Sequence, residues 1–283
     1  MAFDLSYDFY KEEVFNLINS DEKFISAIRN QNQILEYKDL HKLLTKRKKF
    51  FQKSLINQII EFGCGTGWLT NSIAYHYGKN VKGVDYTVKA IEIAEKISRK
   101  IKLKNQFERS NLFTYKDNKE YDLVISIGCL HHTNDCKAAF KKICSFVKKG
   151  GYVYIGLYHL YSRNPMLSYL RSHAYWYGNE SAYNIFKRMN LNMENPEHNY
   201  SWFRDQVFHP QETQHTLKEV KSWLDELSLE LVSTSINNYQ SLKNINMKEL
   251  YNSEKKLEKV SYEKNRFKHE FFPGFFTICA KNN

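Results

Sequence analysis

The chain of 283 residues has room for one large domain or two small ones and can bury a full hydrophobic core. With 20 Tyr and 19 Phe but only 4 Pro, its composition excludes a disordered or low-complexity protein. The net charge of +11 leaves an anionic partner open.

Cysteine usage and hydropathy predict the cellular setting. The five cysteines are an odd number and contain no CxxC pair, a pattern that favours reduced thiols. The first residues, MAFDLSYDFYKEEVF, carry acids where a signal peptide needs a basic flank and an apolar core. No apolar run approaches the roughly 18 residues of a membrane span. We therefore expect a cytoplasmic protein without a membrane span.

The basic residues gather in three clusters, at 46–53, 96–104 and 141–149. A single basic stripe would favour nucleic-acid binding. These clusters fall instead on separate predicted helices, as solvated helix faces do. A nucleic-acid partner is therefore an alternative that the pattern does not favour.

Residues 1–54 are predicted as an N-terminal helical segment that acts as a lid. From Leu55 onward, short apolar runs alternate with helical patterns. The predicted strands are 55–62, 80–86, 106–113, 121–128 and 152–158. Gly150 and Gly151 are interpreted as the end of the helix before the fifth strand. This alternation predicts an α/β fold with a parallel, doubly wound sheet.

The alternation breaks after the fifth strand. Residues 159–215 are aromatic and irregular and are predicted as an inserted cap, with a helix over 168–189. A capping box of Thr216 and Glu219 starts the next helix. Strands over 229–236 and 274–282, with a helical stretch at about 240–268 between them, follow. Residues 55–158 are thus the predicted core, and 216–283 complete its sheet.

The stretch EFGCGTGWLT at 61–70 places three glycines after a predicted strand. A dinucleotide-binding turn would need its third glycine at position 68, which is Trp, and a phosphate-binding P-loop would need a lysine. Glu61 would also repel phosphates at close range. A flat, phosphate-free ligand that carries a cation remains. A nucleoside bearing an amino acid and a sulfonium fits, with Asp85 placed for ribose hydroxyls and Asn111 for the edge of a base.

The chain resembles the class I S-adenosylmethionine-dependent methyltransferases of small-molecule type. The matching segments are EFGCGTG at 61–67, VKGVDY at 81–86, SNLF at 110–113, and the stretches 121–135 and 146–156. The resemblance implies a Rossmann-like seven-stranded sheet with six parallel strands and one antiparallel strand. It also implies S-adenosylmethionine as cofactor and S-adenosylhomocysteine as product. The implied cofactor-binding residues are Glu61, Gly63, Cys64, Gly65, Gly67, Asp85, Tyr86, Asn111, Leu112 and Gly128.

Methyl transfer depends mainly on positioning, with a base added when the acceptor must lose a proton. By the resemblance, His132 lies at the start of the helix that faces the methyl group, although a structural role competes with this one. Asp205, His209 and His215 are further candidates, because charged groups gather in the stretch 202–216. We predict no metal site, since the spacing of His209, Glu212 and His215 is not a standard metal motif and Pro210 interrupts any helix that would align the three.

The absence of certain sequence motifs narrows the range of possible methyl acceptors. The chain lacks the Asn/Asp-Pro-Pro-aromatic segment that is typical of enzymes acting on adenine bases or glutamine amides. It also lacks the Pro-Cys nucleophile of enzymes acting on cytosine and the paired-glutamate loop of enzymes acting on protein arginine. CLHHTND at 129–135 resembles family members that act on small metabolites. We expect a small-molecule acceptor methylated on O, N or C. The alternatives are an RNA methyltransferase or a catalytically inactive cofactor-binding partner subunit, and the oligomeric state stays open.

Overall fold

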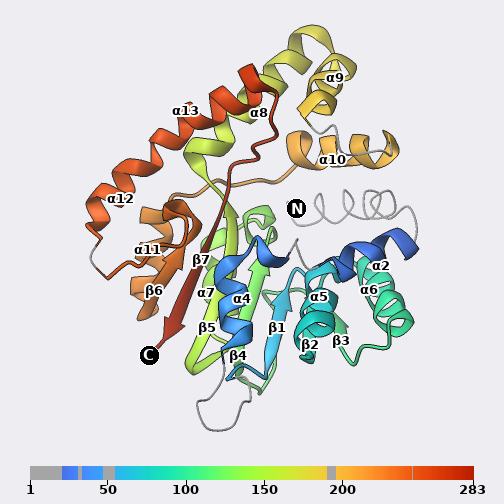
Figure 1. The fold of residues 1–283 in the computed structure, drawn as a ribbon, viewed down its shortest axis with the longest axis vertical. Helices are drawn as coiled ribbons and strands as arrows, with labels where there is room; N and C mark the ends of the chain where they lie inside the picture. The colour runs from blue at the N-terminus through green and yellow to red at the C-terminus, as the bar shows by residue number, and fades with distance from the viewer. Residues whose placement is uncertain (1–20, 31–33, 47–54, 190–195, 244) are drawn as a thin grey trace.

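The structure is a computed structural model that describes residues 21–30, 34–46, 55–189, 196–243 and 245–283. Seven strands form one sheet in the order β3-β2-β1-β4-β5-β7-β6 (Figure 1). Strand β7 is antiparallel to both of its neighbours, and the other neighbouring pairs are parallel. The predicted sheet of six parallel strands and one antiparallel strand is confirmed. The strands are β1 (Ile59–Phe62), β2 (Val81–Asp85), β3 (Gln106–Arg109), β4 (Tyr121–Ile127), β5 (Val147–Tyr158), β6 (Leu229–Thr234) and β7 (Phe275–Asn282).

Helices cover both faces of the sheet, so its central strands are buried on both sides and read as continuous apolar runs. All four residues of β1 are buried. The helices before the cap are α2 (Asp21–Arg29), α4 (Lys38–Thr45), α5 (Trp68–Tyr77), α6 (Val88–Lys100), the 3₁₀ turn η1 (Leu130–His132) and α7 (Cys136–Cys144). Strand order reverses between β1 and β4, and this switch point places a ligand crevice beyond the carboxyl ends of the strands.

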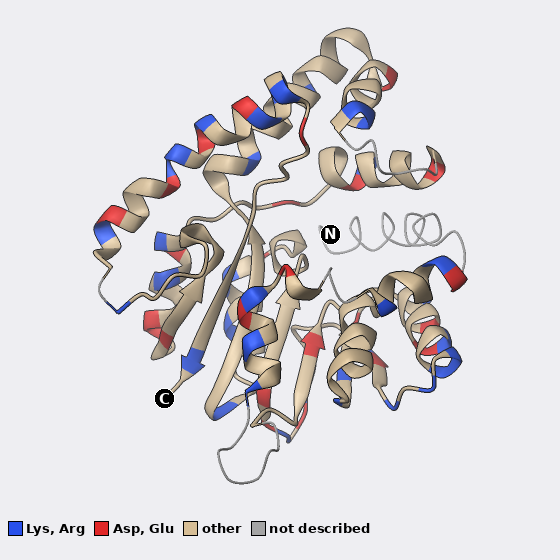
Figure 2. Cartoon of the chain, viewed as in Figure 1, with Lys and Arg blue, Asp and Glu red and all other residues tan. Residues whose placement is uncertain are grey.

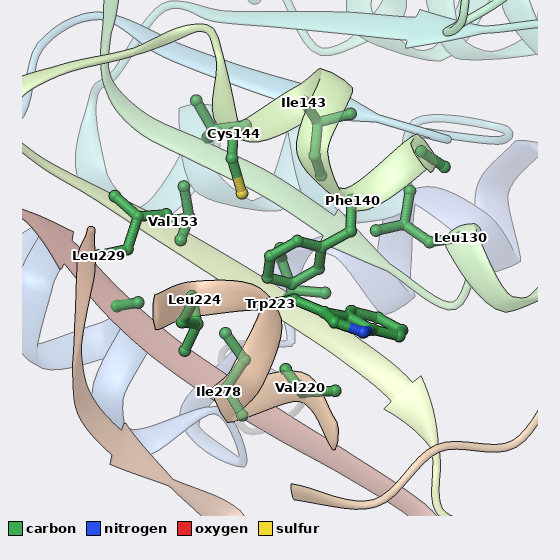
Figure 3. Packing of buried hydrophobic residues seen from close by; sticks show 14 of the residues in the cluster. Leu130, Phe140, Ile143, Cys144, Val153, Val220, Trp223, Leu224, Leu229 and Ile278 are labelled. Carbon is green, nitrogen blue, oxygen red and sulfur yellow. The ribbon is translucent and has the colours of Figure 1, made fainter. Parts of the chain in front are cut away.

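The two faces of the sheet have separate cores. On one face, Leu40 and Leu44 of α4 pack with Ile73 of α5 against the sheet. On the other face, α7 and α11 (Leu217–Glu226) meet through Phe140 and Trp223, whose ring centroids lie 5.4 Å apart (Figure 3). The described part of the N-terminal segment therefore includes one helix, α4, that belongs to the layer over the sheet. The predicted lid role falls on residues that lie in part outside the described ranges.

The cap has a hydrophobic cluster of its own. Helices α8 (Leu160–Tyr177), α9 (Asn179–Met189) and α10 (Pro196–Phe208) bury Leu170, Phe186 and Phe203 together. The remaining elements are the 3₁₀ turn η2 (Ser235–Asn237), α12 (Met247–Glu254), α13 (Lys256–Tyr262) and the π-helix η3 (Glu263–Lys268). Helix α13 runs along α8, so part of the segment 216–283 joins the cap rather than the sheet (Figure 1).

Two sequence interpretations of helix ends were wrong. The single helix predicted over 168–189 is two helices, because Gly178 between α8 and α9 has a φ of 84°. Gly150 and Gly151 do not end a helix: α7 ends six residues earlier, and both glycines lie inside β5. They occupy an irregularity in the pairing of β4 with β5, and Gly150 has a φ of 78°. The glycine pair therefore marks an irregularity in a strand and not the end of a helix.

The surface carries mixed charge. Lys96 and Lys100 contact Asp21, and Lys137 and Lys141 contact Glu226. Basic and acidic residues alternate over the helices and form no single stripe in the view of Figure 2. Among the described helices, none combines the length and the apolarity that crossing a membrane requires.

The aromatic end of α8 does not enclose a pocket. Tyr175, Trp176 and Tyr177 follow one another along the helix and are 77%, 73% and 70% exposed. Beside them lies a shallow surface groove of about 300 Å³ between α8 and α13, lined in part by Trp176 and Tyr262. These three side chains therefore lie at the surface and not in the hydrophobic cluster of the cap.

Candidate active site

The glycine turn between β1 and α5 needs its glycines for conformation. Gly63, Gly65 and Gly67 have φ values of 71°, 52° and 78°, in the left-handed region that other residues enter at a cost. A Cβ on Gly63 would lie 2.3 Å from the Cβ of Cys129, so the backbone here passes directly under the loop after β4. A Cβ on Gly65 would meet nothing within 4 Å. The turn is therefore packed against Cys129 at Gly63, whereas the backbone at Gly65 has open space beside it.

Gly128, at the end of β4, lies across the same crevice. It has a φ of 76°, is exposed, and a Cβ there would also meet nothing within 4 Å. Strands β1 and β4 are neighbours in the sheet, so Gly65 and Gly128 both follow strands at the switch point, where open α/β sheets bind ligands. Bare backbone at both glycines suits a ligand that lies close to the chain.

Asp85, at the carboxyl end of β2, is held by two backbone groups. The N–H of Gly65 donates to its Oδ2 at 2.9 Å, and the N–H of Thr87 donates to its Oδ1 at 2.8 Å. Burial raises the pKa of Asp85, and these N–H bonds oppose the rise. Hydrogen bonds from the side chain of Thr87 and the backbone of Tyr86 also oppose the rise. Several donors therefore fix Asp85 at the end of β2.

Glu61 lies on β1 and joins the strand to the first turn of α5. Its Oε2 accepts a short hydrogen bond from the hydroxyl of Thr70, and the backbone of Thr70 also bonds the carboxyl. Only 4% of Glu61 is exposed. Burial raises its pKa to about 8, Thr70 opposes the rise, and the charge of Asp85 adds to it. A cation bound nearby would lower this pKa again by favouring the ionised carboxylate.

The remaining predicted cofactor residues follow strands β1, β2 and β3 and differ in their exposure. The side chain of Asn111 accepts an N–H bond from Phe113 at 2.9 Å and so shapes its own turn, while Leu112 is buried. The backbone carbonyl of Tyr86 accepts a bond from Arg109 at 3.3 Å. Cys64 is buried, and burial raises the pKa of its thiol well above its usual range. Asn111 thus keeps one acceptor site on its side-chain oxygen for a base edge.

His132 and His209, which are distant in sequence, come into ring contact beyond the end of β4. Their ring centroids lie 3.8 Å apart. Nδ1 of His132 lies 2.8 Å from the carbonyl oxygen of Gln211, and the N–H of Gln211 donates to Nδ1 of His209 at 3.1 Å. Burial lowers the pKa of His132 to about 4 and that of His209 to about 3. Both rings are therefore neutral at pH 7.

Asp205 and His215 have other immediate contacts. The amide of Gln206 donates to Oδ2 of Asp205 at 2.9 Å. The ring of His215 lies 5.0 Å from that of Trp223, and its two nitrogens contact Thr213 at 2.9 Å and Glu219 at 3.1 Å. These contacts account for both nitrogens of His215 without a substrate. The capping box is only half formed, because Glu219 turns to His215 while its N–H bonds the Thr216 hydroxyl.

Arg163, which the sequence did not single out, organises the loop after α10. Its guanidinium is fully buried, and all five of its donors have acceptors. They bind both carboxylate oxygens of Glu212, the side-chain and backbone oxygens of Gln206 and the carbonyl of Pro273 at 2.6–3.2 Å. The guanidinium also lies 3.7 Å from the ring centroid of Tyr158. Its partners are 43 to 110 residues away in the sequence, so no local sequence pattern predicts the role of Arg163.

Tilted rings in contact connect this arginine to the histidine pair. The ring of His131 lies 4.0 Å from that of Tyr158 and 4.3 Å from that of His132. Arg163 contributes to the lowered pKa of His131 and of His132, after burial in both cases. The loop 209–216 is fixed to the end of β5 by a bridge between His159 and His215. The cap and the sheet thus meet at His132.

The described residues also bear on metal binding, and they include one buried carboxylate that joins three helices. Within the described ranges, no three His, Cys, Asp or Glu side chains are grouped so as to hold a metal ion. Glu254 of α12 lies 2.8 Å from Nε2 of His159 and accepts the N–H of Leu217 at 2.6 Å. It therefore ties α12 to the start of both α8 and α11, in a position that the sequence does not reveal.

Comparisons with known proteins agree with this architecture. The sequence model of the family described as methyltransferase domain matches residues 54–271. The ubiquinone biosynthesis O-methyltransferase of Pelagibacter ubique is 25% identical over 134 residues, 42% of this chain and 55% of that protein. Phosphoethanolamine N-methyltransferase 2 of Caenorhabditis elegans is 29% identical over 106 residues, 35% of this chain and 23% of that protein. The chain spans about half the length of the ubiquinone-pathway relatives.

Solved structures share the fold at low sequence identity. The magnesium protoporphyrin IX methyltransferase of Synechocystis PCC 6803, with bound S-adenosylhomocysteine, superposes with a TM-score of 0.56 at 12% identity over all of both chains. PKMT2 of Rickettsia typhi superposes with a TM-score of 0.61 at 13% identity, over 81% of this chain and 49% of that one. The seven-stranded sheet of this chain is therefore that of the methyltransferase structures.

Proposed function

The chain belongs to the methyltransferase-domain family of S-adenosylmethionine-dependent enzymes, and we propose that it transfers a methyl group to a small-molecule acceptor bound beside His132 and His209. The observation that carries this proposal is the crevice at the switch point, where open backbone at Gly65 and Gly128 adjoins Asp85. The histidine pair lies just beyond the end of β4, beside that crevice.

The residues of the crevice fit the cofactor that the family uses. When bound, S-adenosylmethionine supplies an electrophilic methyl group on a sulfonium. In our proposal Asp85 accepts the two ribose hydroxyls, and the side chain of Asn111 accepts from the adenine amine. The glycine turn 63–67 and Gly128 pass close to the amino-acid part and the sulfonium, with Glu61 as a carboxylate near the positive charges.

We assign the acceptor side to the junction of cap and sheet. Helix α10 and the loop after it bring His209 of the cap onto His132, which supports a substrate role for the insertion 159–215. We assign His132 as the base. Asp205, on the stretch of chain that also contains His209, is the second candidate. The contacts of His215 favour a structural role for that histidine. The lid function proposed for residues 1–54 includes Tyr7 to Phe15, which lie outside the described residues.

A small acceptor agrees with the relatives, whose names place them in ubiquinone biosynthesis and on phosphoethanolamine. The pairing of Lys96, Lys100, Lys137 and Lys141 with acids weakens the case for an RNA acceptor. A cytoplasmic location is part of this proposal, since all five cysteines are free thiols.

The test is transfer of labelled methyl from S-adenosylmethionine into a cell extract separated into small-molecule, RNA and protein fractions. Asp85→Ala is the negative control, and Asp117→Ala, which changes a carboxylate bonded to Tyr115 and Tyr121, is the matched control for general damage. We expect label in the small-molecule fraction, lost only in Asp85→Ala. Label in the RNA fraction would mean that the acceptor is RNA and not a small molecule. Intact cofactor binding without label in any fraction would favour the inactive partner subunit.

A further inference from the structure

The part of α8 that lies far from the sheet carries a group of exposed aromatic rings (Figure 1). Among the described residues, ten large hydrophobic side chains are exposed, and five of them lie on α8, α13 and η3: Tyr175, Trp176, Tyr177, Tyr262 and Phe267. The other five are spread over different elements, and none of them is more than 44% exposed. Exposed hydrophobic side chains that occur singly need no explanation, whereas a group at one place indicates an interaction surface.

The shallow groove between α8 and α13 lies beside these rings. Its wall on α8 is one face of the helix, because the lining residues follow helical spacing: Tyr169, Ser172, His173 and Trp176. Its other wall consists of Tyr262 and Arg266, which are four residues apart on α13 and η3. The groove is therefore lined by aromatic rings and contains one cationic side chain.

The charge of Arg266 is not neutralised by the surrounding protein. The other two basic residues of η3 pair with acids at 3.4 Å and 2.8 Å. Arg266 is exposed, and it makes no ion pair with a carboxylate of the described residues. Its guanidinium lies instead 5.7 Å from the ring centroid of Tyr169 and 5.8 Å from that of Phe267. A guanidinium held over two rings keeps its donors for an external anion.

The shape of this surface decides which kind of partner fits. Successive residues of an α-helix differ in direction by about 100°, so Tyr175, Trp176 and Tyr177 point to different sides of α8. Gly178, with a φ of 84°, ends the helix directly after them. Trp176 and Tyr177 line the groove, but Tyr175 does not, so a small molecule in the groove would leave that ring exposed. A soft surface that closes around the convex helix end covers all three rings.

We propose that this aromatic end of the cap docks on a membrane surface that contains anionic lipids. Tyr and Trp have an apolar body and a polar edge, which suits the level of the lipid headgroups. Arg266 pairs with a lipid phosphate, and the net charge of +11 attracts the chain to an anionic surface. The same charges oppose a second copy of this chain at the patch, because a two-fold contact would bring Arg266 of both copies into one interface.

Co-sedimentation of the full chain with vesicles tests the proposal. The vesicles consist of phosphatidylcholine alone or of phosphatidylcholine and phosphatidylglycerol in equal amounts, and we expect binding to the mixed vesicles. Binding should fall at least about 10-fold in Trp176→Ser, which removes a buried ring, and about 5-fold in Arg266→Gln. Tyr75→Ser changes a 44% exposed ring on α5, and Arg99→Gln removes the same single charge from α6. Both matched controls should bind as the natural chain does.

Tryptophan fluorescence reports which part of the chain meets the membrane. Trp176 is the only exposed one of the four Trp, all of which the structure describes. Mixed vesicles should therefore shift the emission to shorter wavelength, and Trp176→Phe, which keeps a ring at this position, should abolish the shift. Glycerol phosphate, which resembles a headgroup without a bilayer, should cause no shift. A shift with glycerol phosphate would indicate a site for a soluble anion and would overturn the proposal.

Three other results would also overturn it. They are the absence of binding to mixed vesicles, equal losses of binding in Arg266→Gln and Arg99→Gln, and self-association of the chain without lipid that Trp176→Ser abolishes. Thermal unfolding of each variant shows whether the fold is intact, which we expect because the substituted side chains are exposed. None of these measurements requires methyl transfer, so their failure leaves the proposed function standing.

Discussion

Replacement of Glu61 by Gln is predicted to stabilise the cofactor-free protein by an amount that grows with pH. The folded protein holds this carboxyl in a buried position that raises its pKa from 4.5 to about 8. Between these two values the folded state binds a proton that the unfolded chain has released. Stability is therefore lost as the pH rises from 4.5 to about 8, and a neutral amide removes this loss. The amide oxygen of Gln can still accept from Thr70.

The magnitude follows from the two pKa values. At pH 7, about 2.5 pH units above the unfolded-state value, the carboxyl destabilises the fold by about 3 kcal/mol at 1.36 kcal/mol per unit. For 283 residues with an unfolding entropy of about 2.1 cal/mol/K each, this is a Tm difference of about 6 °C. Above pH 8 the difference levels off at about 5 kcal/mol, or about 8 °C.

The assay is thermal unfolding between pH 5 and pH 9 without cofactor, followed by circular dichroism. We expect the Tm of Glu61→Gln to exceed that of the natural chain by about 1 °C at pH 5 and about 6 °C at pH 7. Glu120→Gln, which changes an exposed carboxylate, is the matched control and should show no difference at any pH. A difference for Glu61→Gln that is independent of pH, or a lower Tm throughout, would refute the reasoning.

Three further predictions test other parts of the structure. Asp85→Asn is expected to weaken S-adenosylhomocysteine binding by about 10- to 100-fold in titration calorimetry, because hydrogen bonds to a charged group contribute about 1.5–3 kcal/mol; unchanged affinity would remove Asp85 from the site. Gly65→Ala should fold with a loss of about 1–2 kcal/mol and lose cofactor binding, whereas Gly63→Ala, whose Cβ would meet a side chain at 2.3 Å, should be insoluble or unfolded; equal behaviour of the pair would contradict the turn geometry. Arg163→Met should lower the free energy of unfolding in urea by about 3–5 kcal/mol by leaving Glu212 buried without its partner. Adding Glu212→Gln should recover part of that loss, and no recovery would count against the pairing.

The sheet could be predicted from the sequence because its signals are local. Each apolar run of the core and each glycine turn lies within a few residues of the element that it specifies. Asp85 and the glycines of 61–67 illustrate this, since strand, turn and helix follow one another without interruption. Errors arose where a local signal has two structural uses, as at Gly150, which opens an irregularity in β5 instead of ending α7.

The contacts of the stretch 202–216 could be predicted only in part. Polar residues gather in this stretch, but what each one contacts depends on partners elsewhere in the chain. His209 meets His132 across the junction of cap and sheet, His215 turns to Trp223, and the loop is shaped by Arg163. No spacing within the stretch separates these outcomes, because each is decided by tertiary packing.

The central claim is that the crevice at the ends of β1, β2 and β4 binds a nucleoside without phosphates. Titration calorimetry of the full chain with S-adenosylhomocysteine, and in a parallel titration with NAD, tests it most directly. The account predicts one saturable site for S-adenosylhomocysteine, lost in Asp85→Ala, and no heat of binding with NAD, which the glycine spacing disfavours. Saturable binding of NAD, or no binding of S-adenosylhomocysteine by a folded chain, would contradict it.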